Sequence, residues 1–230
     1  MTLKVYIDLF SQPSRALYMF LKLNNIPFEE VNVSLLKGEH RREEFKKINP
    51  FQRVPIIDDN GFILTESVSI LKYLAKKYNA PSHWYPENDV ATVARIDEYM
   101  NWQHLNTRQN SAQLFFNLMM LPKMTRKPID WDQVKILRKK VVEVVKHLDE
   151  YFLMDHLYLC GNEITLADLL GVCELVQLYP VCEEGIYESN PKVKAWMDRV
   201  KTRLGQLFNQ AHEPLFRMRA RFDRNINSKL

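Results

Sequence analysis

One short segment, residues 49–70, constrains the fold more than any other part of the chain. It contains an apolar stretch at residues 54–57 that predicts a β-strand, and Asn60-Gly61 then suits the positive φ angles of a tight turn. Residues 62–65 can pair back as a second strand, and apolar residues at helical spacing begin directly after them. The segment therefore predicts a strand, a hairpin and a helix in immediate succession.

The same segment is suited to binding a ligand. Pro55 stands near the start of the predicted strand, where proline donates no ladder hydrogen bond, so the backbone of Val54 beside it is free for another partner. Glu66 and Ser67 open the predicted helix, whose N-terminus presents free N–H groups and the positive end of its dipole. Free strand backbone beside a helix N-terminus suits a peptide-like ligand that carries a carboxylate.

The first 79 residues as a whole follow an α/β pattern. Residues 3–7 are short, apolar and β-prone, and residues 28–33 alternate apolar and polar side chains, as a half-buried strand does. Pro13 lies early in the helix between them, where its missing N–H is harmless, and residues 39–48 predict a short polar helix. The order strand, helix, strand, helix, strand, strand, helix is that of a thioredoxin-like α/β domain.

The remainder of the chain carries helical periodicity only. Residues 80–90 include two prolines among polar residues and predict a linker. Beyond it, long helices are expected as far as residue 120 and over residues 134–152, so residues 91–230 should form an all-α helical bundle. Thr165 and Asp168 fit a capping box at the start of a further helix, which we favour over a catalytic role for the aspartate.

Composition narrows the functional classes. The formal charge is 32 − 28 = +4 over 230 residues and no run of five like charges occurs, so we expect no nucleic-acid partner. No apolar run approaches the roughly 18 residues of a membrane span. The N-terminus has no basic stretch followed by an apolar one, so we expect a cytoplasmic protein without stable membrane insertion. The cysteines lack metal-binding spacing and the histidines are scattered, so we expect no metal site and small buried thiols.

The segment at residues 49–70 resembles the glutathione-binding half of the cytosolic glutathione transferases. Nearly the whole chain is similar to that family, most of all to its theta class. The matching motifs, whose order and spacing carry the resemblance, are Asp8–Ala16, Lys37–His40, Leu64–Ser67, Trp84–Pro86, Asp97–Tyr99 and Trp102–His104. The resemblance implies that residues 1–79 bind glutathione as co-substrate and that the helical domain holds the electrophile.

The proposed chemistry begins with the thiol of glutathione. A cysteine thiol has a pKa of about 8.5, so hydrogen bonds or positive charge are needed to favour its thiolate near neutrality. The resemblance assigns this hydrogen bond to Ser11, in the loop between the first strand and the first helix. A serine there also suits a helix N-cap, and Ser14 is an alternative candidate. Tyr6 lies within the first strand and is expected in the core.

The resemblance also implies the residues that bind glutathione. Val54, before a cis Val-Pro bond, would pair with its cysteinyl part, and the Glu66-Ser67 pair would hold its γ-glutamyl end. His40 would contact the glycyl end, where nearby arginines supply positive charge for a carboxylate. Ser67 could instead act only as a helix N-cap. The full predicted set is Gln12, His40, Arg41, Arg53, Val54, Pro55, Glu66 and Ser67.

The electrophile site is expected on the first long helix. Leu105 and Arg108 fall on roughly one face of it, and the resemblance directs the arginine toward the active site. An ion pair between helices is an equal alternative for Arg108. The implied substrates are organic halides, reactive sulfate esters and organic hydroperoxides. Leu105 and Asn106 depart from the family, so substrate preference is not carried over.

Two features leave alternatives open. Near the C-terminus an apolar helix face opposes an arginine face, and the resemblance favours a lid over the active site, whereas the pattern alone also suits a membrane surface. These faces consist of Leu215, Met218 and Phe222 against Arg217, Arg221 and Arg224. The family also implies a homodimer, in which Phe51 either crosses the interface or packs in its own domain. A non-catalytic binding or scaffold module is the alternative to an enzyme.

Overall fold

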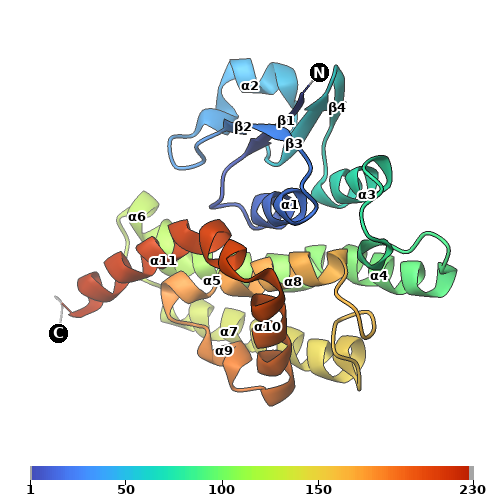
Figure 1. Cartoon of the computed structure of the whole chain (residues 1–230). Coiled ribbons are helices and arrows are strands. Elements are labelled where there is room, and N and C mark those ends of the chain that lie inside the picture. The colour runs from blue at the N-terminus through green and yellow to red at the C-terminus, as the bar shows by residue number, and fades with distance from the viewer. Residues whose placement is uncertain (1, 228–230) are drawn as a thin grey trace.

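The N-terminal part of the chain is built on a four-stranded sheet, as Figure 1 shows. The computed structural model describes the backbone of residues 2–227 and the side chains of residues 2–219. The strand order is β2-β1-β3-β4, with β1 parallel to β2 and antiparallel to β3, and β4 antiparallel to β3. The strands are β1 (Leu3–Ile7), β2 (Phe28–Asn32), β3 (Ile56–Asp59) and β4 (Phe62–Leu64).

Helices cover both faces of the sheet (Figure 1). Residues on successive positions of a strand point to opposite faces, so Ile57 joins the large core against α1 and α3 while Ile56 joins a small cluster with Phe45 of α2. α1 and α3 therefore lie between the sheet and the helical part of the chain, and α2 lies on the outer face. The helices are α1 (Gln12–Leu23), α2 (Glu43–Ile48) and α3 (Ser67–Lys77).

The predicted hairpin and helices are present, with local shifts. Asn60 and Gly61 take φ angles of 57° and 93°, as a tight hairpin turn requires. Strand β3 begins at Ile56, two residues later than predicted and directly after the cis Val54-Pro55 peptide. The predicted helix at residues 39–48 is divided, because the extended backbone of Arg42 ends a 3₁₀ turn and becomes the N-cap of α2.

The helical part begins with a long, nearly continuous helical run, interrupted by π-helical segments that each add a residue to a turn. The run consists of α4 (Val90–Trp102), the π-helical η3 (His104–Arg108), α5 (Gln109–Phe115), the π-helical η4 (Phe116–Met120) and α6 (Leu121–Thr125). After it come α7 (Trp131–His147), the π-helical η5 (Leu148–Leu153), α8 (Leu166–Val176), the 3₁₀ turn η6 (Tyr179–Val181), α9 (Gly185–Glu188), α10 (Pro191–Leu204) and α11 (Gln206–Asn227). None of the described helices is both long and apolar enough to cross a bilayer.

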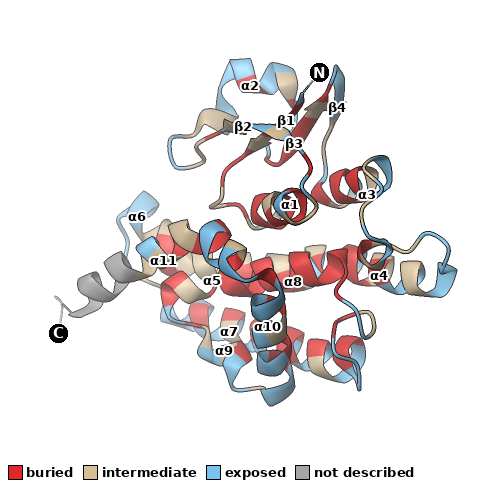
Figure 2. Ribbon diagram, viewed as in Figure 1, coloured by how far each residue is buried: buried red, intermediate tan, exposed pale blue. Residues whose placement is uncertain are grey.

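Helix α8 is the centre of the molecule, and every residue in it is buried (Figure 2). It packs against α1 of the sheet domain on one side and against α4 and η3 on the other. Its N-terminus carries the predicted capping box of Thr165 and Asp168. At Gly171 an added Cβ would lie 2.6 Å from the hydroxyl of Tyr99, so only glycine permits this close approach of α8 to α4.

The expectation of buried thiols is only partly correct. Cys173 is buried in α8 and Cys160 is half-buried, but Cys182 is exposed. Cys182 has a left-handed backbone with φ of 62°, directly after the turn η6, and this places its side chain on the surface. The prediction from cysteine count and spacing was therefore wrong for Cys182, because neither reports the local backbone conformation.

Candidate active site

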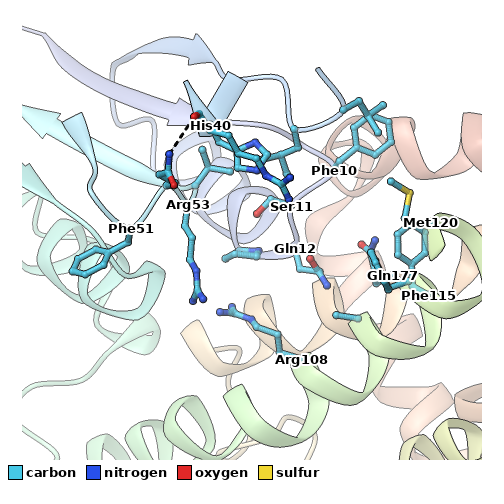
Figure 3. Close-up of a pocket in the computed structure, with 18 of the residues that line it drawn as sticks. Phe10, Ser11, Gln12, His40, Phe51, Arg53, Arg108, Phe115, Met120 and Gln177 are labelled. Atoms are coloured by element: carbon cyan, nitrogen blue, oxygen red, sulfur yellow. Dashed lines mark hydrogen bonds between the residues drawn. The ribbon is translucent and has the colours of Figure 1, made fainter. Parts of the chain in front are cut away.

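A cavity of about 770 Å³ lies between the loops of the sheet domain and the helical wall formed by η3, α5, η4 and α11. In Figure 3, Ser11, Gln12 and the two labelled arginines lie between Phe51 on one side and Phe10, Phe115 and Met120 on the other. Seven of the predicted site residues line it, and Pro55, Glu66, Ser67 and Leu105 do not. The lining includes Phe10, Ser11, Gln12, His40, Arg41, Arg53, Val54, Arg108, Phe115, Phe116, Met120 and Met218.

Ser11 lies in the loop between β1 and α1, and its side chain reaches the cavity (Figure 3). It occupies the N-cap position of α1 but forms no side-chain capping hydrogen bond, so its hydroxyl is not used by the helix. Asp8 fixes the loop, because its carboxylate accepts hydrogen bonds from the backbone N–H groups of Phe10 at 2.9 Å and Leu35 at 2.7 Å. Ser14, the alternative candidate, is fully buried and does not line the cavity.

Arg15 holds the same loop from behind, and sequence reasoning missed it. Its fully buried guanidinium donates to the carbonyl oxygens of Leu9 at 2.9 Å and Phe10 at 3.2 Å. It also donates to the carbonyl oxygen of Cys173 and to Oε1 of Gln177 in and after α8, both at 2.9 Å. An arginine among the apolar positions of a helix was the available signal. Because the Phe10–Ser11 backbone is tied to α8, the cavity hydroxyl is fixed relative to the helical domain.

The segment before β3 supplies the next wall. Val54 is buried and lines the cavity beside its cis bond to Pro55. Asn49 supports it, because its side-chain amide donates to the carbonyl oxygen of Arg53 at 2.9 Å. In Figure 3 the Arg53 side chain extends toward Arg108 on the opposite wall. Two guanidinium groups, one from each part of the chain, therefore face the same space.

His40 and Arg41 come from the 3₁₀ turn before α2 and line the cavity. Burial and the positive charge of Arg41 lower the pKa of the His40 imidazole, so the ring is neutral near neutral pH. Its Nδ1 is buried and has no hydrogen-bond partner among the described residues. Gln52 braces the turn through a 3.2 Å hydrogen bond to the carbonyl oxygen of Arg41, drawn as a dashed line in Figure 3.

The N-terminus of α3 holds a strained residue and a buried unpaired hydroxyl. Glu66 has φ of 65° and ψ of 111°, a sparsely populated conformation for a residue other than glycine. Ser67 is 4% exposed, and its Oγ has no hydrogen-bond partner in the described part of the chain. The N-cap position belongs to Glu66 and not to Ser67. The buried hydroxyl of Ser67 is therefore not a helix cap.

Arg108 both lines the cavity and forms the interhelical ion pair that the sequence left as an alternative. Leu105, predicted to share its face, is 75% exposed and lies outside the cavity. The reason is the π-helical geometry of η3, in which residues three positions apart no longer point the same way. The prediction that Leu105 and Arg108 share one face assumed an α-helix, and it is wrong for this π-helical segment.

Helix α11 closes another side of the cavity. Met218 lines it, and the neighbouring Leu215 is fully buried in the core. Arg217 is exposed and pairs with Glu213 on the same helix. The apolar and basic faces predicted for the tail are thus present as far as residue 219, whereas Arg221, Phe222 and Arg224 lie outside the residues whose side chains are described.

Comparison with known proteins assigns this arrangement to a family. A family model described as "Glutathione S-transferase, N-terminal domain" matches residues 1–76, and one described as "Glutathione S-transferase, C-terminal domain" matches residues 112–203. Glutathione S-transferase theta-1 of Bos taurus is 42% identical, over 94% of this chain and 90% of the relative. The chain belongs to the theta-class glutathione S-transferases.

Other relatives agree with the theta-class assignment. Theta-1 of Homo sapiens is 38% identical over 94% of this chain and 90% of its own length. A human theta-class transferase structure, in complex with the glutathione conjugate of 1-menaphthyl sulfate, has a TM-score of 0.92 and 36% identity, covering 98% of this chain and 92% of that one. The resemblance and the thioredoxin-like and helical fold are confirmed. So is the activity of a glutathione transferase acting on electrophilic substrates.

Proposed function

We propose that this theta-class transferase ionises the glutathione thiol with the Ser11 hydroxyl and transfers the thiolate to an apolar electrophile in the same cavity. The observation that carries the proposal is that the Ser11 side chain lines the cavity and forms no capping hydrogen bond. A hydroxyl fixed in this way can donate to a thiolate and lower the pKa of the thiol. The thiol proton is released to solvent, the sulfur then forms a bond to carbon, and the halide or sulfate leaves with the bonding electron pair.

Glutathione fits along the loops of the sheet domain in this proposal. The backbone beside the cis Val54-Pro55 bond would pair with its cysteinyl part. The neutral ring of His40, with Arg41 and Arg53, would bind its glycyl carboxylate. The unpaired Oγ of Ser67 and the carboxylate of Glu66, which lie outside the cavity lining, would hold the γ-glutamyl end where it extends past that lining. Gln12, half-buried in the cavity wall, would add a polar contact. A human theta-2 structure in complex with glutathione supports the choice of ligand.

The opposite wall indicates the electrophile. Its aromatic rings and thioether groups suit an apolar or aromatic carbon skeleton, whereas Arg108 suits a leaving group that becomes an anion. Aryl-bearing sulfate esters and halides match both features, and the human relative with a menaphthyl conjugate supports this class. The apolar wall consists of Phe10, Phe115, Phe116, Met120 and Met218. Leu105 has no role in this proposal. Because Met218 of α11 lines the cavity, its position favours the proposal that α11 acts as a lid.

The assembly and location also belong to the proposal. A homodimer in the cytoplasm is what the family implies, and Phe51, at 66% exposure, is available for a contact between subunits. Sedimentation of the intact protein would measure that assembly. The division into residues 1–79, a linker at 80–90 and residues 91–230 stays a prediction.

The decisive test is Ser11→Ala. Charge-assisted hydrogen bonds contribute roughly 1.5–3 kcal/mol, so turnover of glutathione with 1-menaphthyl sulfate should fall about tenfold or more. Calorimetric glutathione affinity and the melting temperature should change much less. Ser14→Ala is the matched control, because that hydroxyl is buried three residues along the same helix and does not line the cavity. Near wild-type turnover in Ser11→Ala would rule out the assignment.

A further inference from the structure

A buried carboxylate lies directly behind the cavity arginine. Glu174 in α8 is fully buried, and its Oε1 accepts a hydrogen bond from Nε of Arg108 at 2.7 Å. Burial raises the pKa of Glu174, while the positive charges of Arg108 and Arg15 oppose that effect. Burying a carboxylate costs free energy, and an ion pair only offsets that cost. We therefore ask what the buried Glu174 does for Arg108.

The pairing also orients the guanidinium of Arg108. Its Nε is engaged by Glu174 and its Nη1 lies 3.3 Å from Nδ1 of His104. Its Nη2 is buried and has no hydrogen-bond partner among the described residues. Figure 3 shows the guanidinium directed into the cavity, opposite Arg53. The Arg108 side chain is still 23% exposed, so with its Nε edge anchored the guanidinium keeps an exposed part for whatever the cavity binds.

The positive charges of Arg53 and Arg108 face the same cavity, and Glu174 offsets their repulsion. Arg53 and Arg108 repel each other, and repulsion would favour a conformer of Arg108 that moves away from the cavity. An arginine side chain has several flexible bonds, so it leaves a site readily unless it is held. The Glu174 carboxylate offsets the charge of Arg108 and holds its Nε edge.

We propose that Glu174 is a positioning residue, which holds Arg108 in the conformation that the electrophile requires. It acts from the same helix that receives Arg15, whose bonds fix the loop carrying Ser11. The last turn of α8 and its C-cap, from Cys173 to Gln177, therefore set the relative position of the thiol-activating hydroxyl and the electrophile wall. This proposal rests on the proposed role of Arg108 toward the leaving group.

The test is Glu174→Gln, an isosteric change that removes the charge. The kcat/KM for 1-menaphthyl sulfate should fall about tenfold, the equivalent of one charge-assisted hydrogen bond, while the KM for glutathione stays within about twofold. Glu183→Gln is the matched control, because Glu183 is also buried and ion-paired, to Arg138 by a 2.5 Å contact, yet neither residue lines the cavity. Its kinetics should equal those of the wild type. Equal losses toward both co-substrates in Glu174→Gln would show a structural role only and overturn the proposal.

A double-mutant cycle with Arg108→Gln separates this proposal from the proposed function. If Glu174 acts through Arg108, Glu174→Gln should change kcat/KM little in the Arg108→Gln background. The same tenfold loss in both backgrounds would overturn the proposal while leaving the role of Arg108 intact. Unchanged electrophile kinetics in Arg108→Gln would reject the role of Arg108 and the positioning role with it. Should Glu174→Gln not fold, Glu174→Asp keeps the charge but withdraws the carboxylate, and unchanged electrophile kinetics in that variant would overturn the proposal.

Discussion

Replacing Asp168 with asparagine should destabilise the whole protein without altering its chemistry. The carboxylate of Asp168 is fully buried and faces donors only. Oδ1 accepts from the backbone N–H of Leu159 at 2.9 Å and from Nε1 of Trp196 at 2.8 Å, and Oδ2 accepts from the backbone N–H and the hydroxyl of Thr165 at 2.8 and 3.0 Å. An asparagine has one acceptor oxygen, so its amide group must face a pair of these donors.

The magnitude follows from that mismatch. The Thr165 hydroxyl can rotate to accept, so the least costly orientation leaves one buried N–H without a partner and weakens the two bonds that remain. An unsatisfied buried donor costs roughly 1–3 kcal/mol, and loss of charge assistance adds to it. We expect a loss of about 3 kcal/mol in the free energy of unfolding, or a decrease of about 6–12 °C in Tm.

The assay is thermal unfolding followed by circular dichroism, with kcat measured per folded molecule at a temperature below the transition. Asp168 does not line the cavity, so kcat should equal that of the wild type. Asp130→Asn is the matched control, because Asp130 caps the exposed start of α7 through Gln133 and asparagine caps equally well. A change in Tm for Asp168→Asn no greater than that of the control would refute the reasoning.

Three further predictions concern binding, pH and the tail. Ser67→Ala should raise the KM for glutathione and leave the electrophile KM and Tm nearly unchanged, and an unchanged KM for glutathione would contradict the proposed contact. Burial holds the pKa of His212 well below its usual value, so the unfolded chain takes up a proton below about pH 6.5 that the folded protein does not, and stability should fall as pH falls by up to about 1.4 kcal/mol per unit. His212→Phe should remove that part of the slope in urea melts at pH 7 and pH 5, and an identical slope would contradict it. Cutting the chain after Arg219 should change electrophile KM and kcat more than glutathione KM, whereas a cut after His212 also removes the fully buried Leu215 and should lower Tm strongly. Unchanged kinetics together with lost binding to anionic vesicles would instead support a membrane-surface role.

Features encoded in neighbouring residues could be predicted from the sequence. The Asn60-Gly61 turn and the capping box at Thr165 and Asp168 depend on local backbone and side-chain geometry, and both are present in the structure. The succession of strands and helices along the chain was accessible because alternating and helical spacings of apolar residues distinguish the two kinds of element.

Features that depend on distant contacts could not be predicted in this way. Arg15 bonds to residues 158 and 162 positions away, and no local pattern reports which carbonyl oxygens a buried guanidinium will meet. Glu174 lies in a mostly apolar helix, and the helix sequence gives no indication of its partner Arg108. The π-helical geometry of η3, which directs Leu105 to solvent, has no simple sequence signal.

Asp8 has a consequence for how the cavity can open. Its one carboxylate joins the loop that bears Ser11 to the loop that follows β2, and Arg15 clamps the first of these loops to α8. Because these hydrogen bonds connect the two loops to each other and to α8, we expect the loops to move little relative to that helix. We therefore expect the motion that admits and releases reactants to come from the opposite wall, where Met218 lies on the last helix of the chain. In this view the wall that carries Ser11 stays in place, and the wall formed by α11 moves.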